Sequence, residues 1–120
     1  MQTRQSSQAD SFRHMNSVIA NEYGYNPQSR QLIEEMAELT QAVNKFWRKD
    51  LECGKVEFSK ELASGERYEN IVEQIADVEI LLDQMKLFLG IDAQEIDRVK
   101  GEKLKRQIER IQGAGERNGG

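Results

Sequence analysis

The chain has very few cysteines, histidines and prolines, and each scarcity excludes a class of structure. A single cysteine, Cys53, has no partner for an intramolecular disulfide and cannot form an all-cysteine zinc site. A single histidine, His14, excludes a metal site built on a pair of histidines and gives little basis for a Ser–His–Asp triad. One proline in 120 residues, together with many Glu, Lys, Gln, Leu and Ala residues, favours long uninterrupted helices.

Long hydrophobic runs are missing as well. No apolar stretch approaches the roughly 20 residues of a membrane-spanning helix, and the first residues lack the apolar segment of a signal peptide. We therefore expect a cytoplasmic protein with no membrane partner. The net charge of −4 provides no general attraction to nucleic acid, so a nucleic-acid partner is not expected either.

Helical periodicity and capping residues predict an all-α fold with four helices, at about 10–23, 26–49, 66–89 and 92–112. Gly24 and Gly90 are expected to end the first and third helices, and Asn26 and Asp92 to cap the second and fourth. Residues 50–65 are predicted to connect two helices, with one helical turn near 58–62. The domain is expected to cover residues 1–112, followed by a flexible tail at 113–120.

Apolar residues recur along three of these helices at the spacing of one helix face, and we expect each such stripe to face a core. The stripes are Phe12, Met15, Val18 and Ile19; Leu32, Met36, Leu39, Val43 and Phe46; and Ile71, Ile75, Val78, Leu82, Met85 and Leu89. Four helices of a 120-residue chain cover such stripes only in part. The sequence therefore predicts a four-helix bundle that is completed by association of several copies.

An internal repeat links the second and third predicted helices. Residues 32–46 superimpose on residues 71–85 at an offset of 39, so that Glu35 falls on Gln74 and Glu38 on Asp77. At about 100° per residue, Glu35 lies about 60° and Glu38 about 120° to one side of the stripe centre at Leu32. If the two helices pack along their stripes, three carboxylates and one amide face each other.

Grouped carboxylates raise each other's pKa unless a cation lies among them, and Mg²⁺ prefers such oxygen ligands. Other interpretations compete with a metal site. The pattern E-E-x-x-E occurs by chance on the solvated faces of many helices, and an ancient duplication of a helix hairpin, kept for packing, would also produce part of the repeat.

Residues 34–39, EEMAEL, followed by residues 74–78, QIADV, resemble the MazG-type all-α nucleoside triphosphate pyrophosphohydrolases, whose pattern is E-E-x-x-E, a spacer and E-x-x-D. The resemblance extends from about residue 23 to residue 110. It implies a helical bundle that forms a homodimer or homotetramer. It also implies cleavage of a (deoxy)nucleoside triphosphate between the α and β phosphates, with Mg²⁺ or Mn²⁺, to the monophosphate and pyrophosphate.

Carried over position by position, the resemblance implies catalytic metal ligands at Glu35, Glu38 and Asp77, with Gln74 at the fourth ligand position. The metal would bridge phosphate oxygens and help to activate a water. Glu34 and Glu73 point well away from the stripe by the same helical angles. We expect them to act from outside the ligand set.

Gln74 departs from the family pattern, which has Glu at this position. An amide offers a metal one oxygen, but it brings no charge and cannot act as a base. Three interpretations remain open: a working site with altered metal binding, a contribution from the neighbouring Glu73, or a site impaired by drift or by an engineered Glu→Gln change.

Substrate contacts can be assigned only as candidates. Negative charge develops on the departing pyrophosphate, so cationic side chains are needed there. Each of the candidates is equally typical of an ordinary solvated surface. The phosphate-binding candidates are Lys45, Arg48, Lys49, Lys103 and Arg106, with Arg110 on the same face as the last two. The amides of Gln28 and Asn44 are candidates for reading the base, and Trp47 is a candidate for stacking on it, although packing explains a tryptophan equally well.

Two other classes of protein compete with the enzyme as interpretations of the sequence. A non-catalytic helical module that binds nucleotides or other proteins explains the stripes, the charges and Gln74, but not the repeated acidic flank. A di-iron carboxylate bundle expects E-x-x-H motifs on two helices, whereas His14 lies outside both acidic segments.

Overall fold

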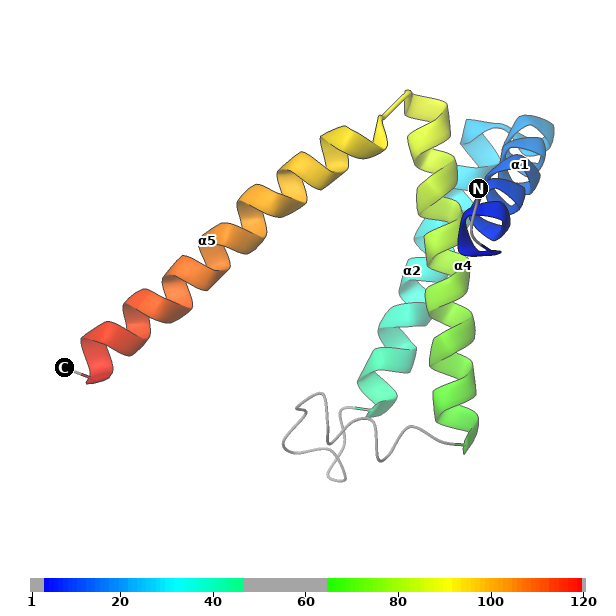
Figure 1. Cartoon of the computed structure of the whole chain (residues 1–120). Coiled ribbons are helices and arrows are strands. Elements are labelled where there is room, and N and C mark those ends of the chain that lie inside the picture. Colours follow the sequence, from blue (N-terminus) through cyan, green and yellow to red (C-terminus); the bar gives the residue numbers. More distant parts are fainter. Residues whose placement is uncertain (1–3, 47–64, 120) are drawn as a thin grey trace. The chain divides into compact units, whose positions relative to one another are not determined.

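The computed structural model describes residues 4–46 and 65–119, and their side chains within 7–45 and 65–115. These residues form four α-helices and no strand: α1 (Arg4–Tyr23), α2 (Tyr25–Phe46), α4 (Gly65–Leu89) and α5 (Ala93–Gly119) (Figure 1). The predicted all-α fold with four helices is therefore confirmed. Most of the predicted connection at 50–65, including the turn near 58–62, lies outside the described residues.

Glycines with positive φ separate the helices where the sequence predicts breaks. Gly24 (φ 84°) donates its N–H to the carbonyl of Ala20 at 2.8 Å and accepts from the N–H of Gln28 at 3.3 Å. It therefore ends α1 and also caps α2, which makes the prediction of Asn26 as the cap wrong. Pro27 lies in the first turn of α2. Backbone N–H groups in a first turn have no partner within the helix, so the missing N–H of proline costs no hydrogen bond there.

The first helix begins at Arg4, six residues before its predicted start at Asp10. Asp10 lies within α1 and pairs with Arg13 one turn later, at 3.9 Å. Residues 4–9, RQSSQA, contain no glycine or proline, so no helix-breaking residue lies between Arg4 and the predicted start at Asp10.

The last helix is capped as predicted and ends later than predicted. Gly90 (φ 64°) follows α4, and the carboxylate of Asp92 accepts the backbone N–H of Gln94 at 3.0 Å. The predicted end near residue 112 is wrong, because α5 continues to Gly119. Glycines such as Gly115 weaken a helix by about 1 kcal/mol each but do not forbid it, and no proline follows.

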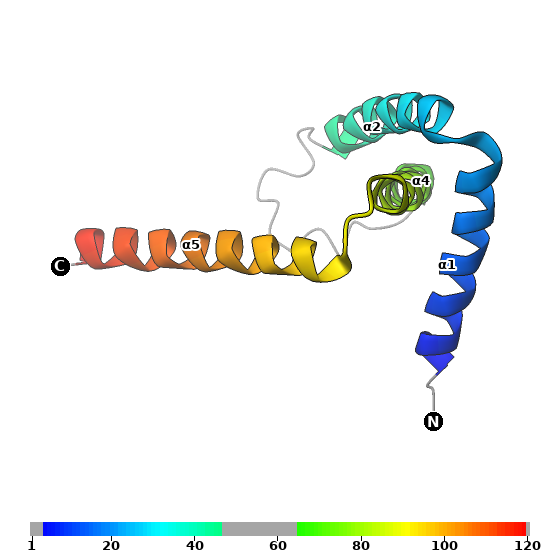
Figure 2. The same cartoon turned by 90° about the horizontal axis from the view of Figure 1, so that it is seen from above.

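The chain comprises two compact units, Met1–Phe88 and Leu89–Gly120. In the first unit, α2 and α4 run antiparallel, and α1 lies beside them near the start of α2 (Figures 1 and 2). Among the residues of this unit that the structure describes, the buried ones are Ala20, Ala42, Val78, Leu81 and Gln84. The second unit contains α5. In the part of the chain that the structure describes, no helix is both long and apolar enough to cross a membrane.

The predicted apolar stripes are buried only in part within one chain. Val78 is buried, but its stripe neighbours Ile75 and Leu82 are 43% and 42% exposed. Large side chains of the other two stripes are exposed as well: Phe12, Met15, Val18, Ile19, Met36 and Val43. Three helices of the first unit bury mainly small residues where they meet, so much of each stripe faces outward. The sequence predicts that the four helices of one chain cover such stripes only in part, and the first unit shows this partial coverage.

Candidate functional site

Polar and aromatic side chains pair across α2 and α4 in one antiparallel register, which we call the α2–α4 seam. A step of seven residues forward along α2, from Gln28 to Glu35, corresponds to seven residues backward along α4, from Gln84 to Asp77. The pairs are Tyr25 with Phe88, Gln28 with Gln84, Glu35 with Asp77 and Glu38 with Gln74. The repeat of 39 residues therefore does bring its acidic flanks together, as the helical angles predict.

We call Glu35, Glu38, Gln74 and Asp77 the acidic cluster. One end of the Gln74 amide lies 3.2 Å from an oxygen of Glu35 and 3.2 Å from an oxygen of Glu38. Both contacts are hydrogen bonds when the amide nitrogen faces the carboxylates. Gln31 donates a further hydrogen bond to the other oxygen of Glu35, at 2.9 Å. Neutral amides thus supply donors to two carboxylates that carry like charge.

Asp77, the third carboxylate of the acidic cluster, has a shifted pKa. The pKa of Asp77 is raised above its ordinary value of 3.8, first by partial burial and then by the negative charge of Glu35. A hydrogen bond from protonated Asp77 to Glu35 adds to the same shift. Carboxylates that hold a proton more tightly than usual are short of positive charge, and a bound cation would relieve that shortage.

The donor set of the acidic cluster fits a hard divalent cation in its chemistry. Three carboxylates offer oxygen atoms, and Gln74 offers its carbonyl oxygen if the amide turns over, since the two orientations differ by an exchange of O and N. As the side chains stand, no three His, Cys, Asp or Glu residues among those described are arranged to hold a metal ion. The amide of Gln74 instead bridges Glu35 and Glu38.

The two remaining acidic candidates, Glu34 and Glu73, are exposed on α2 and α4. Their neighbours Glu35 and Gln74 are only partly exposed and meet across the α2–α4 seam. One residue along a helix is a rotation of about 100°, so Glu34 and Glu73 project to different sides of their helices.

Of the five phosphate-binding candidates, Lys45 is the one that lies in the described part of the first unit. Lys45 is exposed in the last turn of α2, seven residues from Glu38, which is about 10 Å along the helix. Arg48 and Lys49 lie outside the described residues. Lys103 and Arg106 are exposed on α5, in the other unit, as is Arg110.

The base-binding candidates divide between two places. Gln28 and Asn44 lie on opposite sides of the acidic cluster, 16 residues apart on α2, which is about 24 Å. One base cannot contact both of them. Trp47 lies outside the described residues, beyond the end of α2 that carries Asn44.

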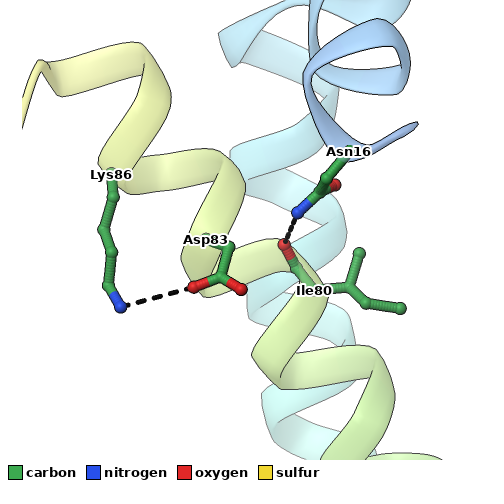
Figure 3. Close-up of polar contacts among 4 residues, drawn as sticks. All are labelled: Asn16, Ile80, Asp83 and Lys86. Atoms are coloured by element: carbon green, nitrogen blue, oxygen red, sulfur yellow. Dashed lines mark hydrogen bonds and ion pairs between the residues drawn. The ribbon is translucent and has the colours of Figure 1, made fainter. Parts of the chain in front are cut away.

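Sequence reasoning missed the residues that tie the three helices of the first unit together. Gln84, buried to 1% exposure in α4, accepts from Gln28 of α2 and donates to Asn16 of α1, both at 2.8 Å. Asn16 in turn donates to the backbone carbonyl of Ile80 at 3.0 Å (Figure 3). Gln84 follows Asp77 by seven residues and therefore shares its helix face, which is the signal that could have pointed to it.

The chain was also compared with known proteins. No protein-family model, curated protein or solved structure matched it.

Proposed function

We propose that the chain is a Mg²⁺-dependent nucleoside triphosphate pyrophosphatase of the MazG type. It would hydrolyse a (deoxy)nucleoside triphosphate between the α and β phosphates, releasing the monophosphate and pyrophosphate. One observation supports this function above others. The family's E-E-x-x-E and E-x-x-D motifs correspond to five positions on two helices, and the side chains of four of them meet in the acidic cluster.

Glu35, Glu38 and Asp77 would hold Mg²⁺ (or Mn²⁺), with the carbonyl oxygen of Gln74 turned toward the ion. When bound, the ion supplies positive charge to the phosphate oxygens that gain negative charge during cleavage. The chain's own carboxylates supply the acid–base capacity. A carboxylate oxygen of Glu35 or Asp77 that does not contact the ion would take up the proton from the attacking water.

Two further groups of contacts belong to the same proposal. Cationic side chains would stabilise the departing pyrophosphate, and the candidates remain Lys45, Arg48, Lys49, Lys103 and Arg106. A second copy of the chain, in a homodimer or homotetramer, would cover the apolar side chains left exposed on the first unit.

The experiment that tests this function measures pyrophosphate release from a panel of ribo- and deoxyribonucleoside triphosphates with Mg²⁺ or Mn²⁺. Glu38→Ala should lower turnover by roughly 100-fold or more, since a carboxylate ligand of the ion is lost. The matched control is Glu79→Ala, which removes an exposed carboxylate from α4 two residues after Asp77. Equal turnover in the two variants, with helicity intact, would reject the site.

A second candidate function is a helical binding module without catalysis. The bridging amide of Gln74 favours it, because two of the carboxylates are satisfied without any cation. Thermal denaturation with and without Mg²⁺ separates the two functions. Stabilisation of the native chain by millimolar Mg²⁺, lost in Glu38→Ala, supports the enzyme, whereas an unchanged melting temperature supports the module.

A further inference from the structure

The hydrogen-bonded amides of Asn16, Gln84 and Gln28 form a chain that we call the amide relay. It starts at the carbonyl of Ile80, passes through the side chains of Asn16 and Gln84, and ends at Gln28, which is only partly exposed. Figure 3 shows its first link, from Asn16 of α1 to Ile80 of α4. The relay thus begins at a backbone group and ends at a side chain near the surface of the first unit.

The backbone carbonyl fixes the orientation of every amide in the relay. A carbonyl only accepts, so Asn16 must present its nitrogen to Ile80 and its oxygen to Gln84. Gln84 must then present its nitrogen to Asn16 and its oxygen to Gln28. An isolated glutamine can exchange the places of its O and N by turning over, but Gln28 would lose its bond to Gln84 if it did so. The outward-facing oxygen and the second N–H of Gln28 therefore cannot exchange places.

An aromatic ring lies beside the end of the relay. Tyr25 precedes Gln28 by three residues on α2, which places both on one side of the helix. Its ring packs edge-on against Phe88, with the ring centres 5.8 Å apart and the ring planes at 90°, and Tyr25 remains 46% exposed. A partly exposed aromatic ring next to an amide matches the two contacts that proteins use on a nucleobase, stacking on its face and hydrogen bonding to its edge.

The distance from this pair to the acidic cluster suits a nucleotide. Gln28 precedes Glu35 by seven residues, so the two side chains share a helix face about 10 Å apart along the axis. A ribose with its α phosphate can bridge such a gap. At the other end of α2, Asn44 has no described amide partner that would fix its orientation in the same way.

We propose that Tyr25 and Gln28 form the base-binding end of the nucleotide site, and that the amide relay makes Gln28 selective between two classes of base. This proposal rests on the proposed function, because the phosphates are taken to lie at the acidic cluster. Adenine and cytosine present an amino donor beside a ring-nitrogen acceptor, whereas guanine and uracil present a carbonyl acceptor beside a ring N–H. The O and N of the Gln28 amide cannot exchange places, and the bound phosphates prevent the base from turning over. The amide can therefore pair with only one of these two arrangements.

The test measures the binding of AMP, CMP, GMP and UMP to the full chain by calorimetry in the presence of Mg²⁺. Monophosphates have no bond between α and β phosphates, so the measurement does not depend on catalysis. The native chain should bind one class, amino or oxo, about tenfold more tightly than the other. Asn16→Ala cuts the relay at a partly exposed position and should bring the two classes within about threefold, because Gln84 and Gln28 can then turn over. Gln28→Ala should also remove the preference.

Two further variants complete the design. Tyr25→Leu should weaken all four nucleotides by a similar factor and leave the ratio between the classes unchanged, because stacking does not depend on the base edge. Gln41→Ala is the matched control, an amide removed from the exposed surface of α2, and it should change neither affinity nor ratio. Circular dichroism confirms that each variant is folded.

The proposal is overturned if the native chain binds both classes equally, if it binds none of the four, or if folded Asn16→Ala and Gln28→Ala keep the native ratio. A loss of preference in the control Gln41→Ala would overturn it as well. Failure of the proposed function looks different. In that case the class preference and its loss on cutting the relay would still be measured, while no triphosphate releases pyrophosphate.

Discussion

The amide relay and the acidic cluster both join α2 to α4, and the relay also reaches α1. They differ in how their polar groups are satisfied. In the relay, donors and acceptors alternate, its two bonds between side chains are 2.8 Å long, and Gln84 is almost completely buried. In the acidic cluster, the amides of Gln31 and Gln74 donate to Glu35 and Glu38, and the pKa of the third carboxylate, Asp77, is raised. One end of the seam is neutral and complete, and the other carries uncompensated negative charge.

This difference indicates which end stabilises the fold and which end is available for chemistry. A buried polar group that has all its partners holds helices in register, whereas losing one partner is costly. A group of carboxylates that lacks positive charge opposes folding slightly and favours a cation. Removing an amide from the relay should therefore destabilise the fold, whereas removing a negative charge from the acidic cluster should stabilise it, and the predictions below follow from that contrast.

The largest effect is expected from Gln84→Met, which keeps the length of the side chain but removes its amide. The partners in Asn16 and Gln28 would each lose a hydrogen bond at the centre of the first unit. We expect a loss of about 2 kcal/mol, or roughly 10 °C in melting temperature at a fixed protein concentration. Gln41→Met, on the exposed surface of α2, is the matched control and should change stability by less than about 0.5 kcal/mol. Similar melting temperatures for the two variants would show that the relay does not stabilise the fold.

The next largest effect is expected from Gln74→Glu, and its sign should depend on Mg²⁺. Without the ion, a fourth carboxylate replaces the amide that donates to Glu35 and Glu38, so stability should fall by about 1 kcal/mol. With Mg²⁺, the added charge should give a larger increase in melting temperature than in the native chain, and faster pyrophosphate release. Gln41→Glu adds the same charge to the surface of α2 and should show no such reversal. Identical Mg²⁺ responses in both variants would argue against a cation at the acidic cluster.

Features set by neighbouring residues were predictable from the sequence. Glycines ended α1 and α4 where expected, and the carboxylate of Asp92 caps α5. The acidic cluster was predictable too, because the periodicity of two helices determines which side chains share a face. The start of α1 and the end of α5 were not, since no strong stop signal stands at either predicted boundary.

Two features were out of reach for a different reason: the amide relay, and which side chains of each apolar stripe are exposed. The relay joins residues 56 to 68 positions apart, and nothing local in Asn16 or Gln84 identifies its partner. Exposure depends on what covers a helix face. Ile75 and Leu82 fit the same periodic stripe as Val78, yet only Val78 is buried in the first unit.

A smaller effect is expected from Asp77→Asn, and it should depend on pH. Because its pKa is raised in the folded chain, Asp77 favours folding most below its ordinary value of 3.8, and this contribution is lost as the pH rises through the raised pKa. At pH 7 without a divalent ion, Asn should therefore increase the melting temperature by about 1–3 °C, and the increase should disappear near pH 3. Thermal denaturation across this range checks the sign. A variant less stable than the native chain at pH 7 would mean that Asp77 is not short of positive charge.

The smallest effect is expected from Gln31→Met, which makes the same exchange as Gln84→Met at the acidic end of the seam. Gln31 donates to Glu35 at 2.9 Å, but both residues are reached by water, which can replace the lost donor. Stability should change by less than about 0.5 kcal/mol, and the affinity for Mg²⁺ by no more than about threefold. Titration with Mg²⁺ followed by thermal denaturation measures both. If Gln31→Met destabilised the chain as much as Gln84→Met, burial would not be what distinguishes the two ends, and the acidic cluster would have to be regarded as part of the structural core.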